Sequence, residues 1–390
     1  MTISSPVFAV LLTLLAFLSI QLTFSFKNKS PPAMRFATIN GLRGYLALFV
    51  MLHHACIWYA FARTDSWSAP DSHLYSHLGQ ASVLLFFMIT GFLFYDKLLN
   101  CRGREFDWSA FLTGRFFRIA PLYFVVLLFV FLIVGYLSHW RMIDSPQAIL
   151  LSIGKWVLFT IPTAVPINGI ADAWIIVAGV TWSLRYEWVF YLALPLISLA
   201  TGQRPVLLML LVAAAGLVIG WKIGLNIKFA AVFLGGILAA CLVRDRRFTE
   251  FCQTKVASLL VLMCFAVVLQ FPTAHQILPC ITLIVAFCII AGGANLFGLL
   301  SLPVSVRLGE LAYGIYLIHG IVLFTTLNFI IGKDATAGMS PPMYWACIAL
   351  LVPVTLALAG IAYHYVEKPG INLGRQLRKR GTPALVPSTD

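Results

Sequence analysis

Residues 41–54 read GLRGYLALFVMLHH, an almost wholly apolar run with Arg43 near its start and His54 at its end. The two residues are eleven positions apart, which is about three helical turns, so their side chains fall on nearly the same face, ~16 Å apart. Asp, Lys and Arg cost roughly 2.5–3.5 kcal/mol each at the centre of a membrane helix. Such groups therefore tend to face the protein interior and to mark functional sites. The run predicts a membrane helix with a reaction chamber along one face.

The composition of the whole chain agrees with this interpretation. Of 390 residues, 61% are hydrophobic and 11% are charged, whereas a soluble domain usually carries about 25% charged residues. We therefore expect an all-α polytopic membrane protein. The net charge of +13 indicates loop orientation and an affinity for anionic ligands. Basic repeats interleaved with aromatic residues are absent, so nucleic acid is not an expected partner. The eight cysteines form no CxxC pair and fit no zinc spacing, so we expect no metal site.

Eleven membrane spans are predicted from the apolar segments. The first covers residues 6–26 and is expected to be an uncleaved helix, with a cleaved signal peptide as the alternative. The organisation is then an extra N-terminal transmembrane helix in 1–26, a membrane domain in 35–369 and a basic cytoplasmic tail in 370–390. The ten further spans are expected at 42–61, 79–98, 119–138, 183–199, 205–221, 227–243, 256–271, 277–296, 311–331 and 344–363.

The distribution of positive charge orients these spans. Loops rich in Lys and Arg alternate with poor ones, as the positive-inside rule requires for a cytoplasmic C-terminus. An apolar run at 149–161 would break the alternation if it crossed the membrane, and Pro162 and Pro166 follow it. We expect a re-entrant or interfacial segment there. The basic loops are 27–43, 97–118, 244–255 and the tail after Lys368, and the poor loops are 62–78, 139–182, 272–276 and 333–343.

His54 is the first candidate for chemistry. An imidazole titrates near neutrality, so it can take a proton from a hydroxyl and give one to a leaving group. The alternative is a histidine that only hydrogen-bonds between helices. The adjacent His53 points some 100° away on a helix, so only one of the two is expected to face a given cavity, and the spacing from Arg43 favours His54.

Arg115 and Arg118 form a second candidate, at the start of a predicted span. Residues at i and i+3 share a helix face, and a guanidinium can grip phosphate with paired hydrogen bonds. Pro121 follows and is expected to kink the helix and open a crevice. The alternative is that both arginines serve topology alone.

Glu187 and His319 complete the set of candidates. Glu187 is flanked by aromatic residues near the predicted outer end of a span, where it could orient a sugar acceptor or support a base. It could equally be an interfacial acid within an aromatic belt. His319 lies near mid-membrane and is a second site member or a buried structural histidine. Three weaker candidates, for which the ordinary interpretation is a helix-end ion pair, are Glu310, Tyr316 and Glu367.

Six short motifs occur in order along this framework. They are Arg-x10-His at 43 and 54, FFMITGF at 86–92, RxxR followed by IAPLY at 115–123, WSLRYEWVFY at 182–191, YLIH at 316–319 and EKP at 367–369. Together they resemble the membrane acyltransferase-3 family, which includes bacterial O-acetyltransferases of surface polysaccharides. The resemblance covers roughly 35–369. Thr90 stands where a serine is expected, and the first span lies outside the pattern.

The resemblance implies a membrane O-acyltransferase of a bacterial inner membrane. The donor would be cytoplasmic acyl-CoA, most often acetyl-CoA, and the acceptor a hydroxyl of a cell-surface glycan or glycolipid such as lipopolysaccharide. Arg43, Arg115 and Arg118 would bind the coenzyme A phosphates. His54 would act as general base, with Glu187 and His319 orienting the acceptor or the base in the catalytic site. Direct transfer and an acyl-enzyme route both remain open.

Two other classes of function fit intramembrane His, Glu and Arg. A transporter or flippase for a lipid-linked saccharide would use them as a substrate pathway or proton relay. Such proteins often show inverted repeats or paired broken helices, and neither is visible in the sequence. A membrane sensor or scaffold would bind no acyl-CoA and would not depend on His54.

Overall fold

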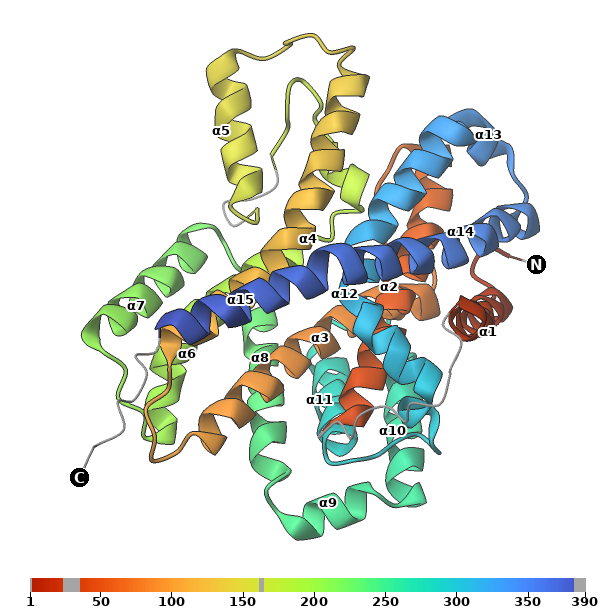
Figure 1. The fold of residues 1–390 in the computed structure, drawn as a ribbon. Coiled ribbons are helices and arrows are strands. Elements are labelled where there is room, and N and C mark those ends of the chain that lie inside the picture. The colour runs from red at the N-terminus through yellow and green to blue at the C-terminus, as the bar shows by residue number, and fades with distance from the viewer. Residues whose placement is uncertain (1, 24–35, 161–164, 382–390) are drawn as a thin grey trace.

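The fold is a bundle of helices whose apolar segments fit a membrane (Figure 1). The computed structural model describes residues 2–23, 36–160 and 165–381, and within them it contains helices and no β-strand. Six helices in these ranges are long and apolar enough to cross a membrane, or seven if the bent pair α8 (Ile227–Leu242) and α9 (Arg246–Cys252) forms one span. The predicted class, an all-α polytopic membrane protein, is confirmed.

The count of eleven spans stays a prediction. Every predicted span falls on a helix, but α8 and four other helices have only 14 to 17 residues, and a perpendicular crossing needs about 20. The long helices are α1 (Pro6–Thr23), α2 (Ala37–Thr64), α3 (His73–Asn100), α4 (Trp108–Leu137), α12 (Pro303–Phe324) and α14 (Pro341–Ala362). The shorter ones are α6 (Trp182–Ser198), α7 (Leu207–Lys222), α10 (Lys255–Val268) and α11 (Ile277–Ala291).

Two helices begin earlier than hydropathy indicates. The α2 helix starts at Ala37 rather than residue 42, and α4 starts at Trp108 rather than residue 119. The Asp107 side chain caps α4 by accepting a hydrogen bond from the Ala110 amide at 2.8 Å, a local signal that hydropathy averaging does not register. As a result, Arg115 lies two turns inside its helix, not at the helix end.

Small residues bring the central helices into backbone contact. The α2 and α12 helices form the most extensive helix pair. A Cβ added to Gly309 would lie 1.9 Å from the Asn40 carbonyl oxygen, and one added to Gly44 would lie 2.7 Å from the Gly309 nitrogen. Tyr45 joins the same two helices through a 2.7 Å hydrogen bond with the Ser305 hydroxyl. Close packing of small residues is the usual way in which helices associate in lipid.

The predicted segment at 149–161 contains a short helix, α5 (Pro146–Val157), which doubles back beside the end of α4 (Figure 1). Ser145 caps it, and the Tyr123 hydroxyl donates a 2.7 Å hydrogen bond to the Trp156 carbonyl. Twelve residues are too few to span a bilayer. Whether the segment is interfacial or re-entrant stays a prediction, and Pro162 lies outside the described residues.

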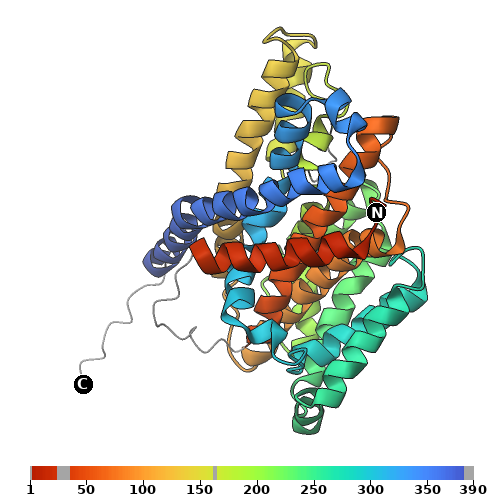
Figure 2. The same cartoon turned by 90° about the vertical axis from the view of Figure 1, so that its right-hand side faces the viewer.

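The two ends of the chain pack on the same side of the bundle. The α1 helix lies along α14 (Figure 2), where the Trp345 indole donates a 2.9 Å hydrogen bond to the Ile3 carbonyl. The α14 helix continues through a π-helical turn, η5 (Tyr363–Glu367), into α15 (Lys368–Gly381), which packs on α4. The basic segment 27–35 and the end of the tail, 382–390, lie outside the described residues.

The glycine contact between α2 and α12 is testable. Gly309→Ala should lower the thermal stability of the detergent-solubilised protein, by roughly 1–3 kcal/mol, because the new methyl group overlaps a backbone carbonyl. The matched control is Gly154→Ala in α5, where no atom lies within 4 Å of the added carbon. Equal melting temperatures for the two variants would contradict the packing described here.

Candidate active site

Three neighbouring cavities run through the bundle beside α2. The arginine pocket encloses about 160 Å³, and Arg43, Arg115, Arg118, Glu187, Tyr191 and Tyr316 are among its lining residues. The histidine pocket encloses about 450 Å³, and His53, His54, Trp67, Trp174, Trp182 and Arg185 are among its lining residues. A junction of about 80 Å³ lies between the two. The junction shares Val83 and Tyr316 with the arginine pocket, and His53, His54, Gln80 and Trp182 with the histidine pocket.

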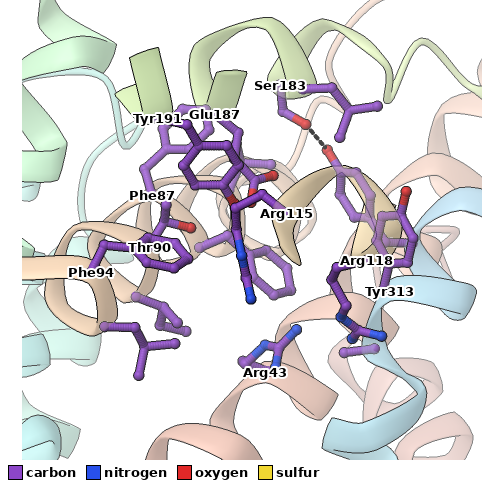
Figure 3. Close-up of a pocket in the computed structure, with 17 residues that line it drawn as sticks. Arg43, Phe87, Thr90, Phe94, Arg115, Arg118, Ser183, Glu187, Tyr191 and Tyr313 are labelled. Atoms are coloured by element: carbon purple, nitrogen blue, oxygen red, sulfur yellow. Dashed lines mark hydrogen bonds between the residues drawn. The ribbon is translucent and has the colours of Figure 1, made fainter. Parts of the chain in front are cut away.

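The predicted phosphate-binding arginines converge on the first cavity (Figure 3). Arg118 forms a 2.5 Å ion pair with the fully buried Glu367, and Arg115 lies 4.9 Å from the centre of the Phe94 ring. Arg43 has neither a hydrogen bond nor an ion pair within the described residues. At least one guanidinium in the pocket is thus available to an anionic ligand.

The expected crevice at Pro121 is closed. A Cβ on Gly370 of α15 would lie 2.6 Å from the Pro121 ring and 3.0 Å from the Phe117 carbonyl oxygen. Proline removes the hydrogen bond to that carbonyl within α4, and α15 covers the resulting gap. The π-helical turn before α15 carries Glu367 to Arg118. The ion pair expected for Glu367 is present, but it joins the interiors of two helices and does not lie at a helix end. Glu310 likewise pairs with Arg307, one turn away.

Glu187 lies among the arginines and not beside the two candidate histidines. It lines the arginine pocket and accepts a hydrogen bond from the Tyr191 hydroxyl. The α6 helix starts at Trp182, which lines the histidine pocket, and Glu187 lies five residues further on, about 7.5 Å along the axis. Its predicted role of orienting the base or the acceptor stays a prediction, although its neighbours are those of the expected donor site.

His54 and His319 are in direct contact, as a joint site requires. Nδ1 of His54 lies 3.0 Å from Nε2 of His319, and Nδ1 of His319 lies 2.9 Å from the Ile315 carbonyl oxygen. A carbonyl can only accept, so Nδ1 of neutral His319 carries its proton and Nε2 accepts from His54. Nδ1 of His54 is then the donor, and its Nε2 holds a free lone pair. The network therefore leaves Nε2 of His54 as its acceptor nitrogen.

The expectation that only one of His53 and His54 faces a given cavity is wrong. Both line the histidine pocket and the junction. His53 also packs against α3, where a Cβ on Gly79 would lie 2.3 Å from its ring. Nδ1 of His53 donates to the Tyr75 carbonyl at 2.7 Å, which leaves its Nε2 as the acceptor nitrogen.

Sequence reasoning missed the residues that surround the two histidines. Trp67 and Trp174 come from predicted outer loops, where no periodicity marks them. Tyr316 stood only among the weaker candidates, yet it lies where the arginine pocket meets the junction. Its hydroxyl is 2.8 Å from the Ser183 hydroxyl (Figure 3). The signal that could have found Tyr316 is its position one helical turn before His319.

The backbone of the histidine-pocket wall is unusual. Thr160 and Ala178 have φ angles of 50°, in the left-handed region. Non-glycine residues in this region cost roughly 1–3 kcal/mol and cluster at functional sites. The short helix η1 (Ala173–Val177) packs directly on α12, because a Cβ on Gly320 would lie 2.3 Å from the Val177 carbonyl carbon. The wall is therefore held in place beside His319.

Comparison with known proteins supplies one match. Residues 36–364 match a family model described as an acyltransferase domain. Neither the curated proteins nor the solved structures include a match to the chain. The matched range includes all six candidate site residues, His54, Glu187, His319, Arg43, Arg115 and Arg118.

The buried ion pair gives a stability prediction. Arg118→Met should destabilise the protein by roughly 3–5 kcal/mol, since it strands the buried Glu367 carboxylate. Adding Glu367→Leu should recover most of the loss. Thermal unfolding in detergent measures both effects. The control is Arg246→Ala, which removes an exposed pair with Glu250 and should cost at most about 1 kcal/mol. An equally small effect of Arg118→Met would refute the buried pairing.

Proposed function

Because this chain belongs to the membrane acyltransferase-3 family, we propose that it transfers an acyl group, acetyl in the simplest case, from acyl-CoA to a hydroxyl of a cell-surface glycan or glycolipid. The observation that carries the proposal is the position of His54. It lies between a cationic pocket suited to a phosphorylated donor and an aromatic pocket suited to a sugar. Family membership also favours acyl transfer over the alternative of saccharide transport.

The donor is proposed to enter from the arginine pocket. Coenzyme A carries several phosphate charges, and guanidinium groups bind phosphate through paired, charge-assisted hydrogen bonds. Arg43 and His54 are about 16 Å apart along α2, and the junction between their pockets shares Val83 and Tyr316 with the first and His54 with the second. The narrow pantetheine arm would follow this path and carry the thioester to His54. The arginine side would face the cytoplasm, as would the C-terminus, in a bacterial inner membrane.

The acceptor hydroxyl is proposed to meet the thioester at Nε2 of His54. Nε2 takes the hydroxyl proton while the oxygen attacks the thioester carbonyl carbon. The tetrahedral intermediate then collapses, the carbon–sulfur bond breaks, and the thiolate takes the proton back from the imidazolium. His319 accepts the Nδ1 hydrogen bond of His54 throughout, which fixes its tautomer and stabilises its positive charge. In a two-step route the acyl group would first reside on the same nitrogen.

The general-base role predicts a large loss of activity on substitution. His54→Gln should lower acyl transfer by about 10²–10⁴-fold, the usual contribution of a positioned base, in mass spectrometry of cell-surface glycans or with purified protein. The control is His73→Gln, an exposed histidine at the start of α3, which should retain activity. Normal acylation by a correctly inserted His54→Gln protein would end the proposal.

The donor site predicts a different kinetic signature. Arg43→Gln should weaken acyl-CoA binding about tenfold or more, the equivalent of one lost charge-assisted contact, and should change turnover at saturating donor much less. Calorimetric titration with acetyl-CoA measures the affinity directly. Arg247→Gln, which removes an exposed charge in a predicted cytoplasmic loop, is the control. Unchanged donor affinity in Arg43→Gln would exclude Arg43 from the donor site.

A further inference from the structure

The histidine pocket contains a cation without a counter-ion. Arg185 on α6 lines this pocket, and no Asp or Glu is among the described residues that line it. The Nε of Arg185 donates a 3.2 Å hydrogen bond to the Trp182 carbonyl, and within the described part of the chain its two terminal nitrogens have no hydrogen-bond or ion-pair partner. The charge in this cavity is therefore available to a ligand.

The orientation of the protein in the membrane does not explain the presence of Arg185. Arg185 lies at the predicted outer end of its span, where the positive-inside rule gives arginine no advantage. It also makes no ion pair with Glu187 two residues away, which lines the arginine pocket instead. The binding of an anionic ligand would explain a cation in this position.

A buried hydroxyl near Arg185 adds a second feature that favours an anion. Thr181 precedes this helix of 17 residues, and its side chain makes no capping hydrogen bond. Its Oγ1 is buried and has no partner among the described residues, although Thr181 lines the pocket and is only 1% exposed. A buried hydroxyl without a partner is costly. The first amides of α6 already donate to the carbonyls of residues 179–181, so the Thr181 hydroxyl is the group at this helix start that is available to a ligand. Thr181 and Arg185, one helical turn apart, thus present donors to the same cavity.

The aromatic residues of the pocket suit a sugar ring. Trp67 and Trp174 meet edge to face, with ring centres 5.8 Å apart and planes at 87°. Trp67 also stacks on the imidazole of His54, at 6.2 Å between ring centres. Flat indole faces provide large, rigid contact surfaces for the C–H face of a pyranose. A sugar that contacts Trp67 and Trp174 within the pocket would lie in the same cavity as the proposed base, His54.

We propose that the histidine pocket binds an acidic sugar unit of the acceptor. Its anionic group pairs with Arg185 and the Thr181 hydroxyl at the start of α6. Its ring packs against Trp67 and Trp174, which brings a neighbouring hydroxyl to His54. The inference rests on the proposed function and narrows its acceptor to an anionic saccharide. The anion is either the carboxylate of a uronic acid or the phosphate that joins a saccharide to a lipid.

Ligand binding to purified protein tests the inference without any need for turnover. Saturation-transfer NMR would compare methyl β-glucuronide and glucose 1-phosphate with methyl β-glucoside. At least one anionic probe should bind about tenfold more tightly than the neutral glucoside, since a charge-assisted contact is worth roughly one decade. Preference for the glucuronide would identify a uronic acid unit, and preference for the phosphate a lipid-phosphate linkage.

Variants separate the pocket charge from folding and from catalysis. Arg185→Gln should reduce the preference to less than about twofold and leave glucoside binding unchanged, Thr181→Val should reduce it in part, and Arg185→Lys should retain part of it. The control, Arg141→Gln, removes an exposed charge from a predicted outer loop and should change nothing. Equal binding of all three probes, or a preference that survives Arg185→Gln, would overturn the inference.

His54→Gln distinguishes this inference from the proposed function. The variant should bind the acidic probe normally and transfer the acyl group about 10²–10⁴-fold more slowly. If it transferred the acyl group normally, the proposed function would fail while the binding result still decided whether the pocket recognises an acidic sugar.

Discussion

The hydrogen bond between His54 and His319 is the contact on which the site depends. It joins α2 to α12 at 3.0 Å, and it exists because glycines at 44 and 309 let the two backbones meet. The Ile315 carbonyl fixes the tautomer of His319, and His319 in turn fixes that of His54. A backbone carbonyl one turn away thereby decides which imidazole nitrogen is free to act as a base. A side chain at either glycine would separate the two helices. The hydrogen bonds that link Ile315, His319 and His54 would then be broken.

The arginine pocket shows how the bundle tolerates buried cations. The cavity is lined by Arg43, Arg115 and Arg118 together with Glu187. Glu367, in η5, forms an ion pair with Arg118. Three positive and two negative formal charges leave one positive charge for a ligand to neutralise. Buried charges are stable only when they are paired and hydrogen-bonded. The acidic partners therefore stabilise the buried arginines, and the pocket still keeps a net positive charge. An anionic donor would complete it.

The arginine and histidine pockets differ in chemistry, and the small junction shares lining residues with both. The arginine pocket is lined by helices alone, whereas the histidine pocket also uses the loop carrying Trp67 and the η1 helix, which is held against α12 at Gly320. A phosphorylated donor and a saccharide acceptor would thus bind at separate places and meet only beside His54 and Tyr316. This arrangement keeps the specificity for each substrate independent of the other.

The sequence by itself determined the membrane class, the order of the helices and most of the candidate residues. Apolar segments of the right length reveal spans, and an arginine or histidine within them is too costly to be accidental. The family resemblance over 35–369 followed from short motifs, and the family match at 36–364 confirmed it. Hydropathy placed the starts of α2 and α4 too late, because polar residues in their first three turns, such as Asn40, Arg115 and Arg118, lower the average.

Only the tertiary structure decided how the candidates are grouped. Glu187 joined the arginines instead of the histidines, and His53 joined His54 at the same cavity. Trp67, Trp174, Thr181 and Arg185 came together from the loop after α2, the η1 helix and the start of α6. Spacing along a single helix fixes directions relative to that helix alone. Which neighbours a side chain meets depends on helix crossings and loop paths, and those are set by close contacts between residues far apart in the sequence.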